Sequence, residues 1–277
     1  MEAAIVKSLN FEIQTNGGQK MKTRFILAMG CVCFFVGLMI TIATSRTAVA
    51  EVVGLWLLDE EKGDIAKDSS GRGHDGNITD GKWVDGKFKN ALRFKDGTHM
   101  EVPDHEDFHF TTEFSIEVWA NIEELPKDHV GIPGKGHDAP IGSFVFHPTK
   151  LNAKQYELRF YISKGGDWPS VKSGAIPFGE WHHLAGTYDG SELKVYVDGE
   201  LAAKGPQKGK INLSEKAPLK FAHDCCGGRT LVGVLDEIRI SNNSLTPDDI
   251  KKSMAGIQLA VEPAGKLATV WGQIKVQ

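Results

Sequence analysis

Residues 181–205 read WHHLAGTYDGSELKVYVDGELAAKG and contain two Asp-Gly pairs, at 189–190 and 198–199. Asp-Gly readily adopts the positive φ angles of a tight hairpin turn. Apolar and polar side chains alternate around the two pairs, so that Leu193 and Val195 share one face of the segment between them. This pattern predicts an antiparallel meander of β-strands.

Further motifs flank the meander on both sides. GLWLLDE at 54–60, DSSGRGHDG at 68–76 and ALRFKDG at 91–97 precede it, and GVLDEIRIS at 233–241 and LTPDDI at 245–250 follow it. In this order, over residues 52–256, they resemble the laminin-G-like, concanavalin A-like lectin/glucanase family. The resemblance implies an all-β fold, an antiparallel jelly-roll β-sandwich that hosts lectins, glycosidases and lyases.

Length and charge restrict the classes of protein to which the chain can belong. Its 277 residues are enough for one large all-β domain, since sandwiches of about 200–250 residues often form one unit. Beyond residue 50, 27 basic and 34 acidic residues give a formal net charge of −7. A mildly acidic domain argues against nucleic acid or an anionic membrane surface as the partner. It is compatible with cations and neutral ligands.

The amino terminus predicts export. The basic start MKTR at 21–24 precedes an apolar run at 25–43 and the small-x-small cleavage pattern Ala48-Val49-Ala50, the layout of a secretory signal peptide. We expect four segments: an upstream extension at 1–20, a signal peptide at 21–50, the β-sandwich at 51–256 and a tail at 257–277. A retained single-span anchor is the alternative, because the apolar run is near the lower limit for spanning. Both alternatives place the domain outside the cell, at its surface or in the periplasm.

Two cysteines remain after the predicted cleavage. Cys225 and Cys226 are adjacent, and neighbouring cysteines form only a strained disulfide ring because their Cα atoms are closer than ordinary disulfide geometry prefers. A disulfide between them, two free thiols and intermolecular pairing all stay open. Zinc would need two more ligands.

Carboxylates near both ends of the sandwich predict a cation. Asp236 has the same parity as Val234 and Ile238, which predicts that it points toward the core, and Asp59 ends the first apolar run. A buried carboxylate is costly without compensation. The family often holds calcium where the first and last strands meet, and the resemblance implies a structural Ca²⁺ held by Asp59, Asp68, the Gly71 carbonyl and Asp236. Alternatively, the aspartates accept bonds from turn amides or pair with Arg72 and Arg239.

No arrangement in the sequence predicts catalysis. The histidines, among them His99, His105, His109, His137 and His147, lack the helical spacing of zinc hydrolases. Acidic residues occur as adjacent pairs such as Asp59-Glu60 and Asp236-Glu237. Adjacent strand residues face opposite sides, so these pairs cannot straddle a glycosidic bond, which needs two carboxylates about 5 Å apart for retaining hydrolysis. We therefore expect a non-catalytic protein.

An aromatic side chain in a loop predicts the ligand site. Trp168 follows Gly165-Gly166-Asp167, and exposed aromatics with a few polar groups typically bind sugars. His137, Asp138 and Asp224 are the candidate polar contacts. Alternatively, Trp168 folds back over the sandwich edge. The sequence thus favours a recognition module that binds glycans or an extracellular protein. The alternative interpretations are a glycoside-active enzyme and a purely structural or adhesive module.

Overall fold

The computed structural model describes residues 12–14, 20–22, 51–126, 130–136, 142–223 and 230–256, the first two ranges by their backbone alone. The chain divides into two units, Met1–Thr47 and Ala48–Gln277. In the first unit, β1 (Glu12–Gln14) pairs antiparallel with β2 (Lys20–Lys22). Apart from residues 21 and 22 in β2, the predicted signal peptide lies outside the described residues. None of the described helices is long and apolar enough to cross a membrane.

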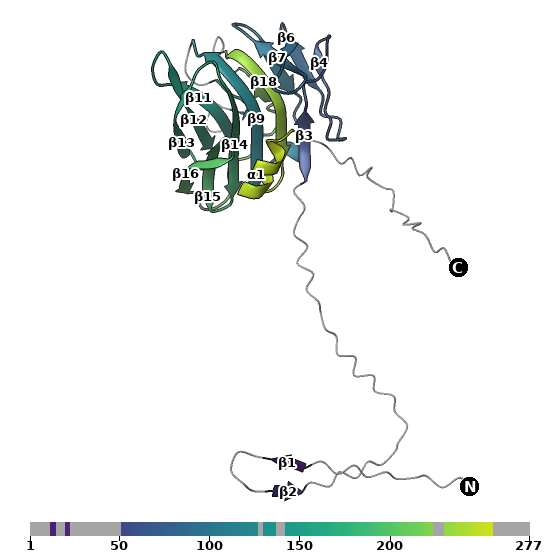
Figure 1. Ribbon diagram of the computed structural model, residues 1–277, viewed down its shortest axis with the longest axis vertical. Coiled ribbons are helices and arrows are strands. Elements are labelled where there is room, and N and C mark those ends of the chain that lie inside the picture. The colour runs from purple at the N-terminus through teal and green to yellow at the C-terminus, as the bar shows by residue number, and fades with distance from the viewer. Residues whose placement is uncertain are drawn as a thin grey trace, which may run out of the picture. The chain divides into compact units, whose positions relative to one another are not determined.

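The second unit contains two antiparallel sheets (Figure 1). The first sheet has the order β13-β12-β11-β10-β17-β8-β5-β4. Its strands, in chain order, are β4 (Ile65–Ala66), β5 (Gly76–Thr79), β8 (His99–Val102), β10 (Gly134–Lys135), β11 (Phe144–Lys150), β12 (Gln155–Ile162), β13 (Ser170–Pro177) and β17 (Leu219–Phe221). With only two residues, β10 is the link between β11, β12 and β13 on one side and β17, β8, β5 and β4 on the other.

The second sheet has the order β16-β15-β14-β9-β18-β7-β6, and β3 also pairs with β18. Its strands are β3 (Val52–Trp56), β6 (Lys82–Asp85), β7 (Asn90–Phe94), β9 (Glu113–Glu124), β14 (Trp181–Asp189), β15 (Glu192–Val197), β16 (Glu200–Pro206) and β18 (Val232–Ser241). The predicted meander forms β14, β15 and β16. Both residues of its second turn have positive φ, 50° at Asp198 and 77° at Gly199, as Asp-Gly hairpin turns require.

The core lies between the two sheets. Phe114 of β9 meets Phe144 of β11 with ring centroids 4.9 Å apart, and both side chains are fully buried. A Cβ atom at Gly186 of β14 would lie 2.9 Å from the Phe146 ring, so glycine permits the sheets to approach each other here. The predicted all-β sandwich of antiparallel sheets is confirmed.

Helix α1 (Pro247–Ser253) packs on the outer face of the second sheet. Thr246 caps it through a capping box with Asp249, as Thr before Pro predicts. Beneath the helix, Glu117 of β9 accepts a hydrogen bond from Ser253 Oγ and lies 2.6 Å from Arg239 Nε. Glu117 is 1% exposed. The bond from Ser253 joins the helix to the sheet, and the buried ion pair links β9 to β18 beneath it.

Asp236 differs from its predicted orientation. It is fully buried, but it pairs with Trp119 on the outer side of the sheet, because a bulge follows it at Glu237, where φ is 48°. The bulge shifts the alternation, so Leu235 and Ile238 belong to the core and Asp236 does not. Residues of the loop before β7 cover it instead, since Phe88 N–H donates to its Oδ2 at 3.0 Å.

Candidate functional site

Trp168 lies in a tight loop between β12 and β13. Lys164 and Asp167 exchange two backbone hydrogen bonds of 3.0 Å each, and Gly165 supplies the positive φ of 69° that this turn needs. The bond from Ile162 N–H to the Pro169 carbonyl, 3.1 Å long, closes the loop. These bonds fix the backbone of the loop from which the indole extends.

The indole of Trp168 is half-buried and rests on a glycine. A Cβ atom at Gly142 would overlap two carbon atoms of the indole ring and the carbonyl oxygen of Gly136. The indole also lines a hollow of about 660 Å³, together with Lys164, Gly165, Asp167, Pro169 and Gln207. The ring thus packs against the sandwich, as one alternative for Trp168 predicts. It also borders the hollow, as the ligand-site alternative predicts.

The other predicted ligand contacts and the two cysteines lie outside the described residues. They are His137, Asp138, Asp224, Cys225 and Cys226. The described residues on their N-terminal side include Lys135 and His223. Lys135, near the 137–141 segment, pairs with Phe144 and Leu219. His223, which precedes Asp224, pairs with Gly131 and Thr230. Of the four predicted ligand residues, only Trp168 therefore has a described place beside the hollow.

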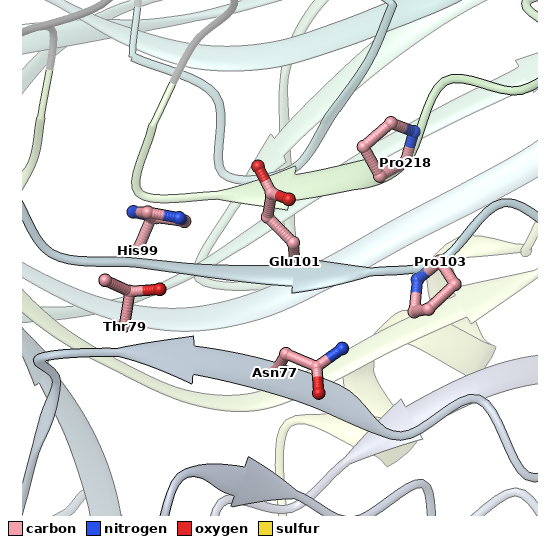
Figure 2. Close-up of a pocket in the computed structure, with 6 residues that line it drawn as sticks. All are labelled: Asn77, Thr79, His99, Glu101, Pro103 and Pro218. Carbon is pink, nitrogen blue, oxygen red and sulfur yellow. The ribbon is translucent and has the colours of Figure 1, made fainter.

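A second, smaller hollow of about 120 Å³ lies on the outer face of β5 and β8. Figure 2 shows the side chains of these strands pointing to the same side. Asn77 pairs with Glu101 in register and Thr79 with His99, and Pro103 and Pro218 complete the lining. Glu101 lies 3.2 Å from Lys220 Nζ. No sequence motif predicts this hollow, because its residues come from three distant segments.

Charged residues continue across the outer face of the first sheet. Arg159 of β12 donates to Glu157 at 2.5 Å and to the Tyr161 hydroxyl at 3.2 Å. Burial lowers the pKa of Arg159, but the bonds to Tyr161 and Glu157 outweigh it and raise that pKa overall. This row of polar groups can offer hydrogen bonds to a polar ligand.

Among the described residues, a single carboxylate lines each hollow. Asp167 borders the hollow beside Trp168 and Glu101 borders the smaller one. Hydrolysis of a glycosidic bond by the usual mechanism needs two carboxyl groups on either side of it. The described lining of neither hollow supplies that pair.

The predicted calcium residues separate into two groups. The carboxylate of Asp68 accepts hydrogen bonds of 2.7–3.0 Å from Leu55 N–H, His74 N–H and both donors of Ser70. Both of its oxygens thus serve the turn that contains Gly71, which agrees with the alternative that the aspartates accept bonds from turn amides.

Asp59, which follows β3, and Asp236 of β18 both contact the turn before β7. Lys89 Nζ lies 2.7 Å from Asp59 Oδ2, and the N–H of the preceding residue, Phe88, donates to Asp236. One buried oxygen of each aspartate, Oδ1 in both, has no hydrogen-bond partner among the described residues. Burial raises the pKa of Asp236 to about 7, against the opposing bond from Phe88. The donor chemistry of these two carboxylates fits a hard cation.

Histidines also converge with a carboxylate elsewhere. His74, His105 and Asp107 offer ligand atoms that all lie within 4.8 Å of one another, a group that could hold a metal ion. His74 and His105 lie far apart in the sequence and lack the helical spacing of zinc hydrolases, so no motif predicted this group. Only the fold brings the loop before β5 beside the 3-10 helix η1 (Glu106–Phe108).

Solved structures with similar folds are distant in sequence. Domain 4 of AbnA, a GH43 extracellular arabinanase from Geobacillus stearothermophilus in complex with arabinotriose, superposes with a TM-score of 0.59 at 20% identity. That match covers 73% of this chain and 98% of the domain. The binding domain of Paraclostridial Mosquitocidal Protein 1 gives 0.57 at 16% identity, covering 73% of this chain and 51% of that one.

An enzyme is among the structural neighbours as well. Trypanosoma rangeli sialidase in complex with the inhibitor DANA gives a TM-score of 0.54 at 17% identity, and the match covers 74% of this chain but only 33% of the sialidase. No curated protein sequence matches the chain. The family model described as the concanavalin A-like lectin/glucanases superfamily matches residues 94–251, more than half of the sequence. The chain therefore belongs to the concanavalin A-like lectin/glucanase superfamily.

Proposed function

We propose that residues 51–256 form an exported, non-catalytic recognition module that binds a glycan in the hollow beside Trp168. The observation that carries this proposal is the half-exposed indole fixed against Gly142 at the edge of a hollow with polar neighbours. Sugars bind where an aromatic face and a few polar groups converge. Lys164, Asp167 and Gln207 are the polar groups here, and the single carboxylate favours binding over hydrolysis.

The first test is a glycan array that includes arabino-oligosaccharides and sialosides, followed by calorimetry with the best oligosaccharide. Trp168→Ala is expected to weaken binding about thirtyfold, because truncating an aromatic anchor at the centre of a site costs about 2 kcal/mol or more. Trp181→Ala, an equally half-buried tryptophan on β14 in the other sheet, is the matched control and should bind as wild type.

The outcomes distinguish the three functional classes. Loss of binding in Trp168→Ala alone supports the proposed module. Release of shorter sugars from the array ligands would identify an enzyme instead. A wild-type chain that binds no array glycan would contradict glycan recognition and favour a partner protein or an adhesive role.

The position of the indole can be tested separately from its presence. Gly142→Ala places a methyl group where the Trp168 ring and the Gly136 carbonyl lie, so the ring must shift. We expect glycan affinity to fall about tenfold or more, since displaced contacts lose most of their binding free energy, while the tryptophan itself remains. Calorimetry measures this, and Gly166→Ala is the control because its Cβ would meet no atom within 4 Å. If Gly142→Ala and wild type bind the glycan with equal affinity, the position of the Trp168 ring against Gly142 is not needed for binding, which would contradict the proposal.

We further propose that a structural Ca²⁺ supports the sandwich. The predicted ligands are Asp59, Asp68, the Gly71 carbonyl and Asp236. The support is strongest for Asp59 and Asp236, because one buried oxygen of each has no hydrogen-bond partner in the part of the chain that the structure describes. Ca²⁺ takes carboxylate and carbonyl oxygens with water. When bound, the ion would neutralise a carboxylate that burial disfavours. Lys89, whose side chain is 77% exposed, can leave Asp59 at little cost.

A further inference from the structure

Three side chains that can bind a metal ion meet where the loop between β4 and β5 contacts η1. None of them lines the hollow beside Trp168. His74 Nε2 lies 2.9 Å from Asp107 Oδ2, and His105 Nδ1 lies 3.5 Å from the same oxygen. The two imidazole rings have centroids 4.4 Å apart. Ions such as Zn²⁺ bind nitrogen and carboxylate oxygen at about 2.0–2.2 Å, which places ligands of one ion about 3–3.5 Å apart. Both histidine nitrogens lie at about this distance from Asp107 Oδ2, and all three ligand atoms lie within 4.8 Å of one another.

The fold holds His74 in place. Its backbone N–H donates to Asp68 Oδ2 at 2.9 Å, and its carbonyl accepts the Trp56 indole N–H at 2.9 Å. Its ring lies 4.8 Å from that of Phe108, and the residue is 8% exposed. A ligand that is already ordered loses little conformational freedom when an ion binds. His105, whose side chain is 47% exposed, leaves the cluster open to solvent.

We propose that His74, His105 and Asp107 bind a divalent transition-metal ion such as Zn²⁺, with water as the remaining ligand. In the metal-free chain the His74 Nε2–H donates to the Asp107 carboxylate. The ion takes the place of that proton, and neutral His74 then carries its proton on Nδ1. The Nδ1 lone pair of His105, which accepts the Asp107 N–H at 3.2 Å, turns to the metal. Nitrogen ligands suit zinc better than calcium. The site is also separate from the proposed Ca²⁺ site, because the two sites have no ligand residue in common.

Arg72 competes with the metal for the same carboxylate. Its Nη1 lies 2.9 Å from Asp107 Oδ2, and its Nη2 pairs with Glu51. Burial opposes ionisation of Asp107, but the bonds from His74 and Arg72 outweigh it and hold its pKa below the usual range. The carboxylate is therefore ionised in the metal-free chain. Glu51 remains as a partner for the guanidinium when the ion occupies Asp107, so Arg72 lowers the affinity for metal without preventing binding.

Calorimetric titration of the chelator-treated full chain with ZnCl₂ tests the site. Wild type is expected to bind Zn²⁺, and His105→Ala to lose about tenfold or more of the affinity, as expected when a three-residue site loses a ligand. Arg72→Gln should bind several-fold more tightly, a result that a merely structural cluster would not give. His182→Ala is the matched control, since His182 lies 2.8 Å from Asp198 and belongs to no three-residue group among the described residues.

A second readout does not depend on heat. Co²⁺ in place of Zn²⁺ should give visible absorption in wild type and Arg72→Gln that His105→Ala lacks. The proposal is overturned if wild type binds no Zn²⁺, or if His105→Ala binds as tightly as wild type. Neither result would affect glycan binding by Trp168, so the two proposals fail separately.

Discussion

In a chelating buffer, the wild-type chain is expected to lose up to about 4 kcal/mol of stability relative to Asp236→Asn as the pH rises from 4 to 7. The folded-state pKa of Asp236 is raised to about 7 by burial, whereas the unfolded chain releases this proton near the model value of 3.8. Between these values the folded state binds more protons than the unfolded state, so stability falls with rising pH and is constant above the window. Asparagine does not titrate and still offers an acceptor to Phe88 N–H.

Urea unfolding of both proteins at several pH values measures this difference. Added Ca²⁺ should remove the loss in wild type, because the bound ion stabilises the ionised carboxylate, and should not change Asp236→Asn to the same extent. Asp248→Asn, an exposed aspartate of α1, is the control and should give a curve parallel to wild type. Parallel curves for Asp236→Asn would contradict the raised pKa. If Ca²⁺ does not change the pH dependence of wild-type stability, the proposed Ca²⁺ site is rejected, but the raised pKa of Asp236 is not.

Glu117→Ala is expected to lower the free energy of unfolding by about 3–5 kcal/mol, the usual cost of leaving one partner of a buried ion pair uncompensated. Arg239, whose side chain is 13% exposed, would lose the carboxylate 2.6 Å away, and Ser253 would lose its acceptor. Glu117→Gln keeps the shape and the bond from Ser253, so it should cost less. Denaturant unfolding at neutral pH measures both variants.

The same strand provides a matched control for this prediction. Glu123 forms a bidentate pair with Arg93 at 2.8 Å, and these side chains are 37% and 39% exposed. Glu123→Ala should cost no more than about 1 kcal/mol, as exposed pairs do. Equal losses in Glu117→Ala and Glu123→Ala would show that burial does not set the energy of the pair. A double variant that also lacks Arg239 should lose less than the sum of the single variants.

The fold could be predicted because its signals are local. Two Asp-Gly turns and the alternation between them define β14, β15 and β16, and Thr246-Pro247 marks the start of α1. Parity failed at Asp236, because a bulge at Glu237 reverses which side chains face the core. A positive φ at a glutamate has no signal in the sequence, since such conformations are rare for residues other than glycine.

The candidate sites could be predicted only in part. Trp168 follows a glycine turn that is visible in the sequence, but its seat on Gly142 and the neighbour Gln207 come from other segments. His74 lies close to His105 only because β5 pairs with both β4 and β8. Contacts between distant segments follow from the pairing of strands, which periodicity alone does not specify.

The shortness of β10 has a consequence for the whole first sheet. Strand β10 itself contributes only Gly134 and Lys135 to the register between β11 and β17. The segment before it continues the connection, because Ile132 N–H donates to the Phe146 carbonyl and Ala222 N–H donates to the Gly131 carbonyl. The indole hollow belongs to the half with β12 and β13, and the smaller hollow to the half with β5 and β8. Because the two hollows share no lining residue, substitutions that change the specificity of one should leave the lining of the other unchanged.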